Sequence, residues 1–268
     1  MLKKNIYKFK TPIILFCAGS MYAAGFPILA TEFSIIFAPI VGFSILLSFL
    51  NITSNQITRI NFKSQVSYII YFSLGFYSLG FYWIPYTLQE FGAIPSPFHI
   101  LLGLIFTVVL LPQLITLTII QTSINNFLIK KKIDNNYLSV KHILIAFLLT
   151  LLEQLIPQQF PAHIGHSWLQ LAPFLGLTPI LGAASFSFIS FLAALIISRY
   201  FKYKKLDYFS LVIVVIFIIA NFLFPLRSQE NLQYKYQLRI VQANIGNNLK
   251  ISSEEGSPLS IKKVFKRY

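Results

Sequence analysis

Residues 173–198 read PFLGLTPILGAASFSFISFLAALIIS, a stretch without a charged side chain. A helix needs roughly 20 mainly apolar residues to cross about 30 Å of hydrocarbon, so this stretch predicts a transmembrane helix. The whole sequence of 268 residues has the same character, because 56% of it is hydrophobic and only 11% is charged. Soluble domains are about 25% charged. We therefore expect an all-α polytopic membrane protein.

Six other segments share this apolar character, although three of them are short. The seven predicted spans are residues 12–30, 33–50, 66–86, 98–120, 142–156, 173–198 and 209–225. Backbone polar groups in lipid must pair within their own segment, which makes helices the expected form. The sequence thus predicts a transmembrane helical domain over residues 1–225 and a tail over 226–268.

The positive charges predict how these spans are oriented. Fourteen of the 22 Lys and Arg residues precede the first span or lie on alternate short loops, and the other three short loops contain none. The fourteen are Lys3, Lys4, Lys8, Lys10, Arg59, Lys63, Lys130, Lys131, Lys132, Lys141, Arg199, Lys202, Lys204 and Lys205. Cytoplasmic loops are enriched in Lys and Arg. We therefore predict a multi-pass protein of a bacterial inner membrane, with a cytoplasmic N-terminus, a periplasmic tail and no nucleic-acid partner.

Two of the loops on the predicted periplasmic side carry unusual residues. The first, Gly80–Pro95, contains Trp83 and a turn that includes Phe91, Gly92 and Pro95. An aromatic belt at the membrane interface would by itself explain Trp83. It does not explain the turn.

The second loop, Glu153–Trp168, contains an acid near the end of an apolar helix. Such an acid is costly in lipid, so Glu153 is a candidate functional residue. The alternative is that Glu153 lies at the membrane interface, where its carboxylate is hydrogen-bonded to water or to backbone amides. His163 and His166 are three residues apart, which suits a metal only on a helix, and Pro161 and Gly165 favour a loop. We predict no metal site and no cofactor. The single cysteine, Cys17, excludes an intrachain disulfide.

Within the tail, residues 237–244 begin with partial alternation and end in a turn-forming Asn, a pattern that predicts one β-strand followed by a loop. One strand cannot form a sheet, and roughly 40 residues are too few for an unassisted core. The tail therefore has the pattern expected at the start of a further domain.

Taken together, these features resemble the bacterial apolipoprotein N-acyltransferase family. Gly80–Pro95 is similar to the family's Gly-x-x-Trp followed by Phe-Gly-Gly-x-Pro. Residues 153–165 are similar to Glu-x-x-Arg, Gly-Phe-Pro-Trp and Gly-Tyr-Ser, the last beginning at Gly165. Residues 241–245 are similar to the Val-Gln-Gly-Asn-Ile that opens the nitrilase-like domain, with Gln242 and Asn244 in matching positions. The sequence departs from these motifs at Ile156, Ala162 and Ala243, where the family has Arg, Trp and Gly.

The resemblance implies an enzyme that transfers an acyl chain from a phospholipid to the N-terminal diacylglyceryl-cysteine of lipoproteins. Family members use a Glu, a Lys and a Cys of the nitrilase-like domain for this step, and none of the three can be matched in this sequence. We therefore expect a truncated or split membrane half that is inactive by itself and has no catalytic residue of its own. Whether the chain counts as an enzyme stays open.

The resemblance also implies contacts for four residues. Trp83, Glu153, Phe160 and Pro161 are expected to meet lipid head groups or the catalytic domain. Membrane phospholipids are the expected partners, together with apolipoproteins or a separately encoded catalytic half. The alternative is a small polytopic transporter or channel subunit, in which Glu153 would be the intramembrane acid.

Overall fold

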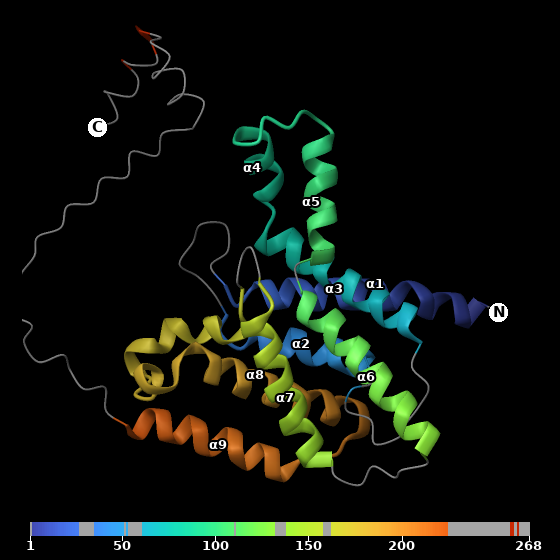
Figure 1. Cartoon of the computed structure of the whole chain (residues 1–268), viewed down its shortest axis with the longest axis vertical. Coiled ribbons are helices and arrows are strands. Elements are labelled where there is room, and N and C mark those ends of the chain that lie inside the picture. The colour runs from blue at the N-terminus through green and yellow to red at the C-terminus, as the bar shows by residue number, and fades with distance from the viewer. Residues whose placement is uncertain are drawn as a thin grey trace, which may run out of the picture. The chain divides into compact units, whose positions relative to one another are not determined.

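The computed structural model describes residues 2–26, 35–50, 52, 61–109, 111–131, 138–157, 162–224, 258–259 and 262. Every regular element in these residues is a helix, as predicted for this fold class. The elements are α1 (Leu2–Ala23), α2 (Ala38–Phe49), α3 (Phe62–Gly80), α4 (Ile84–Glu90), α5 (Phe98–Val109), α6 (Pro112–Lys131), α7 (Leu138–Leu155), the 3₁₀ helix η1 (Ile164–Phe174), α8 (Thr178–Tyr203) and α9 (Tyr208–Leu223) (Figure 1). The strand predicted within the tail lies outside the described residues.

The chain divides into two compact units. Unit 1 comprises Met1–Tyr82 and Phe106–Leu226, and unit 2 comprises Trp83–Ile105 and Arg227–Tyr268. Within unit 1, α1 packs on α2, α2 on α8 and α8 on α9, so that these four helices follow one another across the unit in Figure 1.

Most of the predicted spans correspond to one helix each, with shifted ends. The prediction of one span over 98–120 differs from the structure, which has α5 and α6 there. Pro112 begins α6. Proline has no N–H to donate, and it disfavours a helical conformation in the residue before it, so a continuous helix is broken at this point. The predicted span 173–198 also differs, because Phe174 ends η1 and α8 begins only at Thr178.

One helix within the described residues, α8, is both long enough and apolar enough to cross a membrane. Two further apolar helices, α2 and α9, are shorter. In α8 the backbone at Gly182 leaves the helical conformation, with φ 66° and ψ 179°. This conformation is essentially restricted to glycine, and it separates the first turn of α8 from the rest of the helix.

The closest helix packing in unit 1 joins α1 to α3. A Cβ atom added to Gly19 would collide with the carbonyl of Phe72, and one added to Gly75 would collide with the carbonyl of Phe16. The hydroxyl of Ser20 donates to the carbonyl of Gly75 at 3.2 Å. A Cβ atom added to Gly80 would lie 3.6 Å from that of Ala23. Ala23 follows Phe16 in α1 as Gly80 follows Gly75 in α3, so the two helices run parallel.

An aromatic cluster fills the space beside this contact. The ring of Tyr22 is buried and lies 5.6 Å from the ring of Phe72 and 4.9 Å from that of Phe76, edge to face in both cases. Phe43 brings α2 into the cluster, and its ring lies 5.2 Å from that of Phe191 in α8. Edge-to-face aromatic pairs add to the energy of burial, so this cluster forms the core of unit 1.

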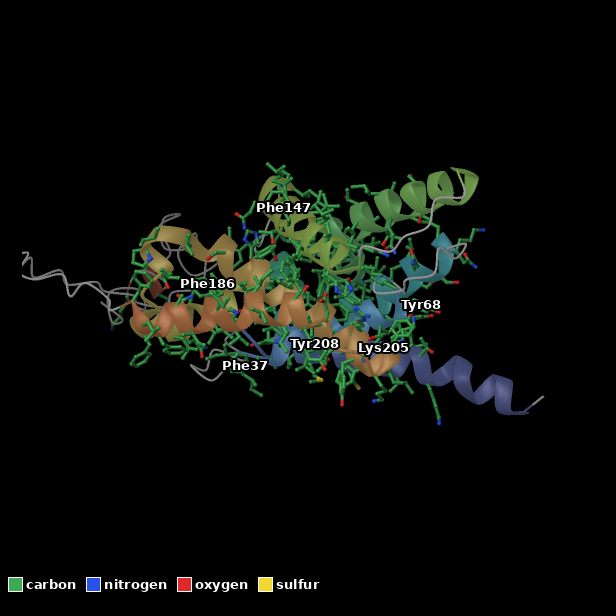
Figure 2. All side chains as sticks on the ribbon, turned by 90° about the horizontal axis from the view of Figure 1, so that it is seen from below. Phe37, Tyr68, Phe147, Phe186, Lys205 and Tyr208 are labelled. Carbon is green, nitrogen blue, oxygen red and sulfur yellow. The ribbon has the colours of Figure 1, made fainter. Side chains whose placement is uncertain are left out.

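Hydrogen bonds join the termini of neighbouring helices at each of the two ends of unit 1. At the basic end, which we define by Ser48, Gln65, His142, Lys202 and Asp207, the ends of α2 and α8 meet the starts of α3, α7 and α9. At the Glu153 end, the end of α7 meets η1 and the first half of α8. Figure 2 shows Lys205 and Tyr68 towards one side of the bundle and Phe37 and Phe186 towards the other.

Candidate functional site

The candidate site is a buried polar cluster around Glu153, two residues before α7 ends. Glu153 is 1% exposed. Its Oε1 accepts a hydrogen bond from the backbone N–H of Ile164, the first residue of η1, at 2.9 Å. The chain leaves α7 and returns at this point, so the carboxylate satisfies an amide at the start of a helix, where intrahelical partners are lacking. Of the two explanations considered for Glu153, the structure shows the bond to a backbone amide.

A serine of α8 completes the cluster. The backbone N–H of Gly165 donates to Oγ of Ser187 at 3.1 Å, and the same serine is close enough to interact with the Glu153 carboxylate. A Cβ atom at Gly165 would collide with the carbonyl of Ala183 and would lie 2.6 Å from Oγ of Ser187. Glycine at 165 therefore allows η1 to lie directly on α8.

The two carboxylate oxygens of Glu153 differ in their hydrogen bonding. Its Oε2 is buried and has no hydrogen-bond partner in the part of the chain that the structure describes. The hydroxyl of Tyr22 lies near enough to interact electrostatically with Glu153, and it donates a long hydrogen bond of 3.4 Å to the carbonyl of Ala162. A buried acceptor without a donor is costly, so this oxygen is the point of the cluster that can accept one further hydrogen bond.

The segment η1 is anchored along α8 by Trp168. Its Nε1 donates to Oγ of Ser190 at 2.8 Å, and its ring packs edge to face against Phe37. Leu169 and Phe174 remain exposed on the outer side of η1. Long 3₁₀ helices are uncommon, and this one is held by the Glu153 and Trp168 contacts at its first turns.

The two histidines of this loop stack on each other. Their ring centroids lie 4.8 Å apart with an interplanar angle of 24°. A 3₁₀ helix has three residues per turn, which places His163 and His166 on one face although the segment is no α-helix. Nε2 of Gln154 donates to Nδ1 of His163 at 3.2 Å. Burial lowers the pKa of His163, and the charge of His166 lowers it further.

Among the residues that the structure describes, no group of three or more His, Cys, Asp or Glu side chains is placed to hold a metal ion. The site is therefore described by its hydrogen bonds alone.

The remaining candidate residues are spread over other parts of the chain. Unit 2 contains Trp83, Phe91, Gly92 and Pro95. The Trp83 carbonyl accepts hydrogen bonds from the backbone and hydroxyl of Thr87 at 3.0 and 3.2 Å, so Trp83 starts α4. Phe91 is exposed and follows the end of α4. Phe160, Pro161, Gln242 and Asn244 lie outside the described residues.

The serines that complete the site were not among the residues predicted from the sequence. Ser187 and Ser190 lie within the apolar stretch that predicted a membrane helix, and both are fully buried. Serine is tolerated in such helices as a small residue, so its presence gave no signal. Their spacing of three residues places both on the helix face that η1 covers, and this periodicity could have indicated a polar contact.

Comparison with known proteins agrees with the motifs of the two loops. A family model described as the apolipoprotein N-acyltransferase N-terminal domain matches residues 18–196, from the second half of α1 to most of α8. No curated protein matches the chain. The matched region includes Glu153, Gly165 and Ser187, and it covers well over half of the 268 residues. The chain therefore belongs to the apolipoprotein N-acyltransferase family, which is a family of membrane proteins.

Proposed function

We propose that this chain forms the membrane-embedded part of an apolipoprotein N-acyltransferase. In this role it supports the transfer of an acyl chain from a phospholipid to the N-terminal diacylglyceryl-cysteine of lipoproteins. The single observation that carries the proposal is the family match over residues 18–196. The match also favours this role over that of a transporter or channel subunit.

The distribution of polar and apolar side chains in α9 supports a membrane location. The helix buries Ser210 and Asn221, whereas Val212, Ile216 and Ile219 are more than half exposed. A helix in water would have the reverse arrangement. Exposed apolar surface of this extent is covered by lipid or by another protein, and lipid is the covering expected for a family of membrane proteins.

The two ends of unit 1 support an orientation. Lys63, Arg199, Lys202, Lys204 and Lys205 belong to the basic end, and cytoplasmic segments are rich in such residues. We therefore assign the basic end to the cytoplasmic side of a bacterial inner membrane. The Glu153 end, and with it the chain after Leu223, is assigned to the periplasmic side.

The role of the Glu153 end follows from this orientation. Glu153 holds η1, which lies on the first half of α8, and the side chains of Leu169 and Phe174 are exposed there. This surface is suited to meet acyl chains and the family's nitrilase-like domain, where acyl transfer occurs. The chain's single cysteine, Cys17, lies within α1. We therefore expect no acyl transfer by these 268 residues alone.

Labelling of single cysteines tests the orientation. In a Cys17→Ser background, Lys205→Cys should react with a membrane-impermeant maleimide only after the cells are opened. Leu169→Cys, at the Glu153 end, should react in cells whose outer membrane alone is permeable. The reverse pattern would contradict the orientation, and reaction of both cysteines from one side would contradict the multi-pass arrangement.

Acyl transfer is tested in two steps. The purified chain in phospholipid vesicles should add no acyl chain to a diacylated lipopeptide, as measured by mass spectrometry. A chimera that joins residues 1–240 to the nitrilase-like domain of an active relative should add one acyl chain. The matched control joins the same domain to an unrelated membrane anchor. Equal activity of the two fusions would show that this membrane part contributes nothing specific and would overturn the proposal.

A further inference from the structure

The last turn of α8 and the turn that follows it present three lysines within four residues, Lys202, Lys204 and Lys205, and all three are exposed. Nζ of Lys202 donates to the carbonyl of Ser48 at 3.2 Å and lies 5.6 Å from the ring centroid of Tyr203. Nζ of Lys204 lies 5.3 Å from the ring centroid of Tyr200. Cation–π contacts at exposed sites are individually weak. Here they hold two ammonium groups at defined places on the surface.

The backbone directs these lysines outward. Lys204 adopts a left-handed conformation, with φ 53° and ψ 30°, at the end of α8. The chain reverses there, and Asp207 then starts α9 as its N-terminal cap, accepting from the backbone N–H of Ser210 at 3.3 Å. Lys204 and Lys205 therefore occupy the outer side of a turn that is fixed at both ends.

The acid of this turn faces the protein interior. Asp207 is 3% exposed, and its Oδ2 accepts from Nδ1 of the buried His142 at 2.8 Å and from the hydroxyl of Ser210 at 2.7 Å. Its carboxylate is thus engaged with α7 and α9, while the neighbouring ammonium groups of Lys204 and Lys205 face outward. The outer surface of the turn is cationic.

Exposed apolar and aromatic side chains border the lysines on both sides. Phe201 is 50% exposed, Tyr208 is 71% exposed and Phe209 is 59% exposed. A polyanion in water would leave these rings uncovered. Lysines beside tyrosines and phenylalanines are instead typical of the boundary between head groups and acyl chains, and basic clusters at this depth bind anionic lipids.

We propose that Lys202, Lys204 and Lys205 bind the phosphate of an anionic phospholipid head group in the leaflet at the basic end. The three ammonium groups donate to the phosphate oxygens, and the neighbouring rings contact the glycerol and the first carbons of the acyl chains. The inference rests on the membrane location proposed above. It adds a lipid site on the membrane side opposite to the Glu153 end.

The test compares binding of phosphatidylglycerol and phosphatidylcholine to the full chain by native mass spectrometry, after its insertion into phosphatidylcholine vesicles has been verified by flotation. The wild type should prefer phosphatidylglycerol. The double variant Lys204→Gln/Lys205→Gln should lose at least about fivefold of this preference, since each lysine near a membrane surface contributes a factor of roughly five. Raising the salt concentration should reduce the preference of the wild type in the same direction.

A matched control removes two charges elsewhere at the same side of the protein. Lys10→Gln/Lys63→Gln, in exposed positions of α1 and α3, should keep the preference. Equal losses in both double variants would overturn the site, because they would indicate diffuse attraction. A wild type that inserts but shows no preference would overturn the lipid site alone, whereas failure to insert would also overturn the proposed membrane location.

Discussion

The carboxylate of Glu153 accepts a hydrogen bond from the backbone N–H of Ile164, eleven residues later in the chain, at 2.9 Å. This single bond joins the end of α7 to the start of η1. Glu153 is buried, so the acid acts on the structure of the segment after α7 from within the protein. Changing it should therefore affect η1 before it affects anything else.

Two replacements of Glu153 distinguish the contribution of its hydrogen-bond acceptor from the contribution of its negative charge. Glu153→Ala leaves the buried N–H of Ile164 without an acceptor and should cost about 1–3 kcal/mol of stability. Glu153→Gln keeps an acceptor oxygen and should cost less. Thermal unfolding in detergent measures both, and the fluorescence of Trp168 reports on η1. Equal destabilisation by the two variants would show that the charge, and not the hydrogen bond, holds the loop.

The glycines between α1 and α3 provide a steric prediction with a control in the same helix. Gly75→Ala places a methyl group against the carbonyl of Phe16, and overpacking of this kind typically costs about 1–3 kcal/mol. In Gly80→Ala the new methyl group would lie no closer than 3.4 Å to its neighbours, the nearest being a ring carbon of Phe76. Thermal unfolding should show a clear loss for Gly75→Ala and a small change for Gly80→Ala. The opposite order would contradict the parallel contact.

The buried pair of His142 and Asp207 should couple in a double-mutant cycle. Either single variant, His142→Phe or Asp207→Leu, leaves a buried polar partner behind and should cost about 3–5 kcal/mol. The double variant should cost clearly less than the sum of the two. Additive losses would show that the 2.8 Å contact contributes no pairwise energy. Ser210→Ala, which removes only one bond to Asp207, serves as the milder reference.

The lowered pKa of His163 predicts a dependence on pH at the Glu153 end. The fold favours the neutral imidazole, so the unfolded chain binds more protons below the usual His pKa of 6.5. The contribution of this pKa shift to the stability of the fold is complete above pH 6.5. It is lost as the pH falls through the lowered pKa that His163 has in the folded chain. His166 stacks on this ring, and its charge lowers the pKa of His163 further.

The measurement is the fluorescence of Trp168 between pH 7.5 and 5. Its change on acidification should shrink in His163→Asn, whose side-chain oxygen can still accept from Gln154. His142→Phe controls for the buried histidine at the other end and should leave the local change intact. An unaltered acid response in His163→Asn would assign the titration to another group.

Parts of this structure could be predicted because they depend on local sequence. An apolar run that begins directly after Asp207 predicted the last span over 209–225, and α9 occupies 208–223. Glu153 was recognisable because an acid in an apolar helix is costly. Its partner Ile164 was not recognisable, since this backbone amide lies eleven residues away in the sequence and meets Glu153 only in the folded chain. The resemblance to the family was confirmed, because the family model matches residues 18–196, which include the motifs of the two loops.

Other parts depended on contacts that a single sequence does not reveal. The buried serines of α8 bind η1, but in the sequence they cannot be distinguished from small residues that fill space. The break at Pro112 and the 3₁₀ conformation of residues 164–174 altered two predicted boundaries. Hydropathy describes which segments are apolar, whereas the ends of these helices are set by proline and by side-chain hydrogen bonds.

The parallel contact of α1 and α3 constrains the order in which this protein can assemble during synthesis. Two parallel helices need an antiparallel segment between them, and α2 provides it. The carbonyl of Gly75 accepts a hydrogen bond from the hydroxyl of Ser20, and the ribosome adds Gly75 to the chain 55 residues after Ser20. In the membrane location proposed above, the face of α1 that carries Gly19 would therefore remain in the bilayer without its partner until α3 has been inserted. The first stable folding unit of the nascent chain is therefore a three-helix assembly, and a ribosome stalled after α2 would expose a membrane intermediate that quality-control proteases can recognise.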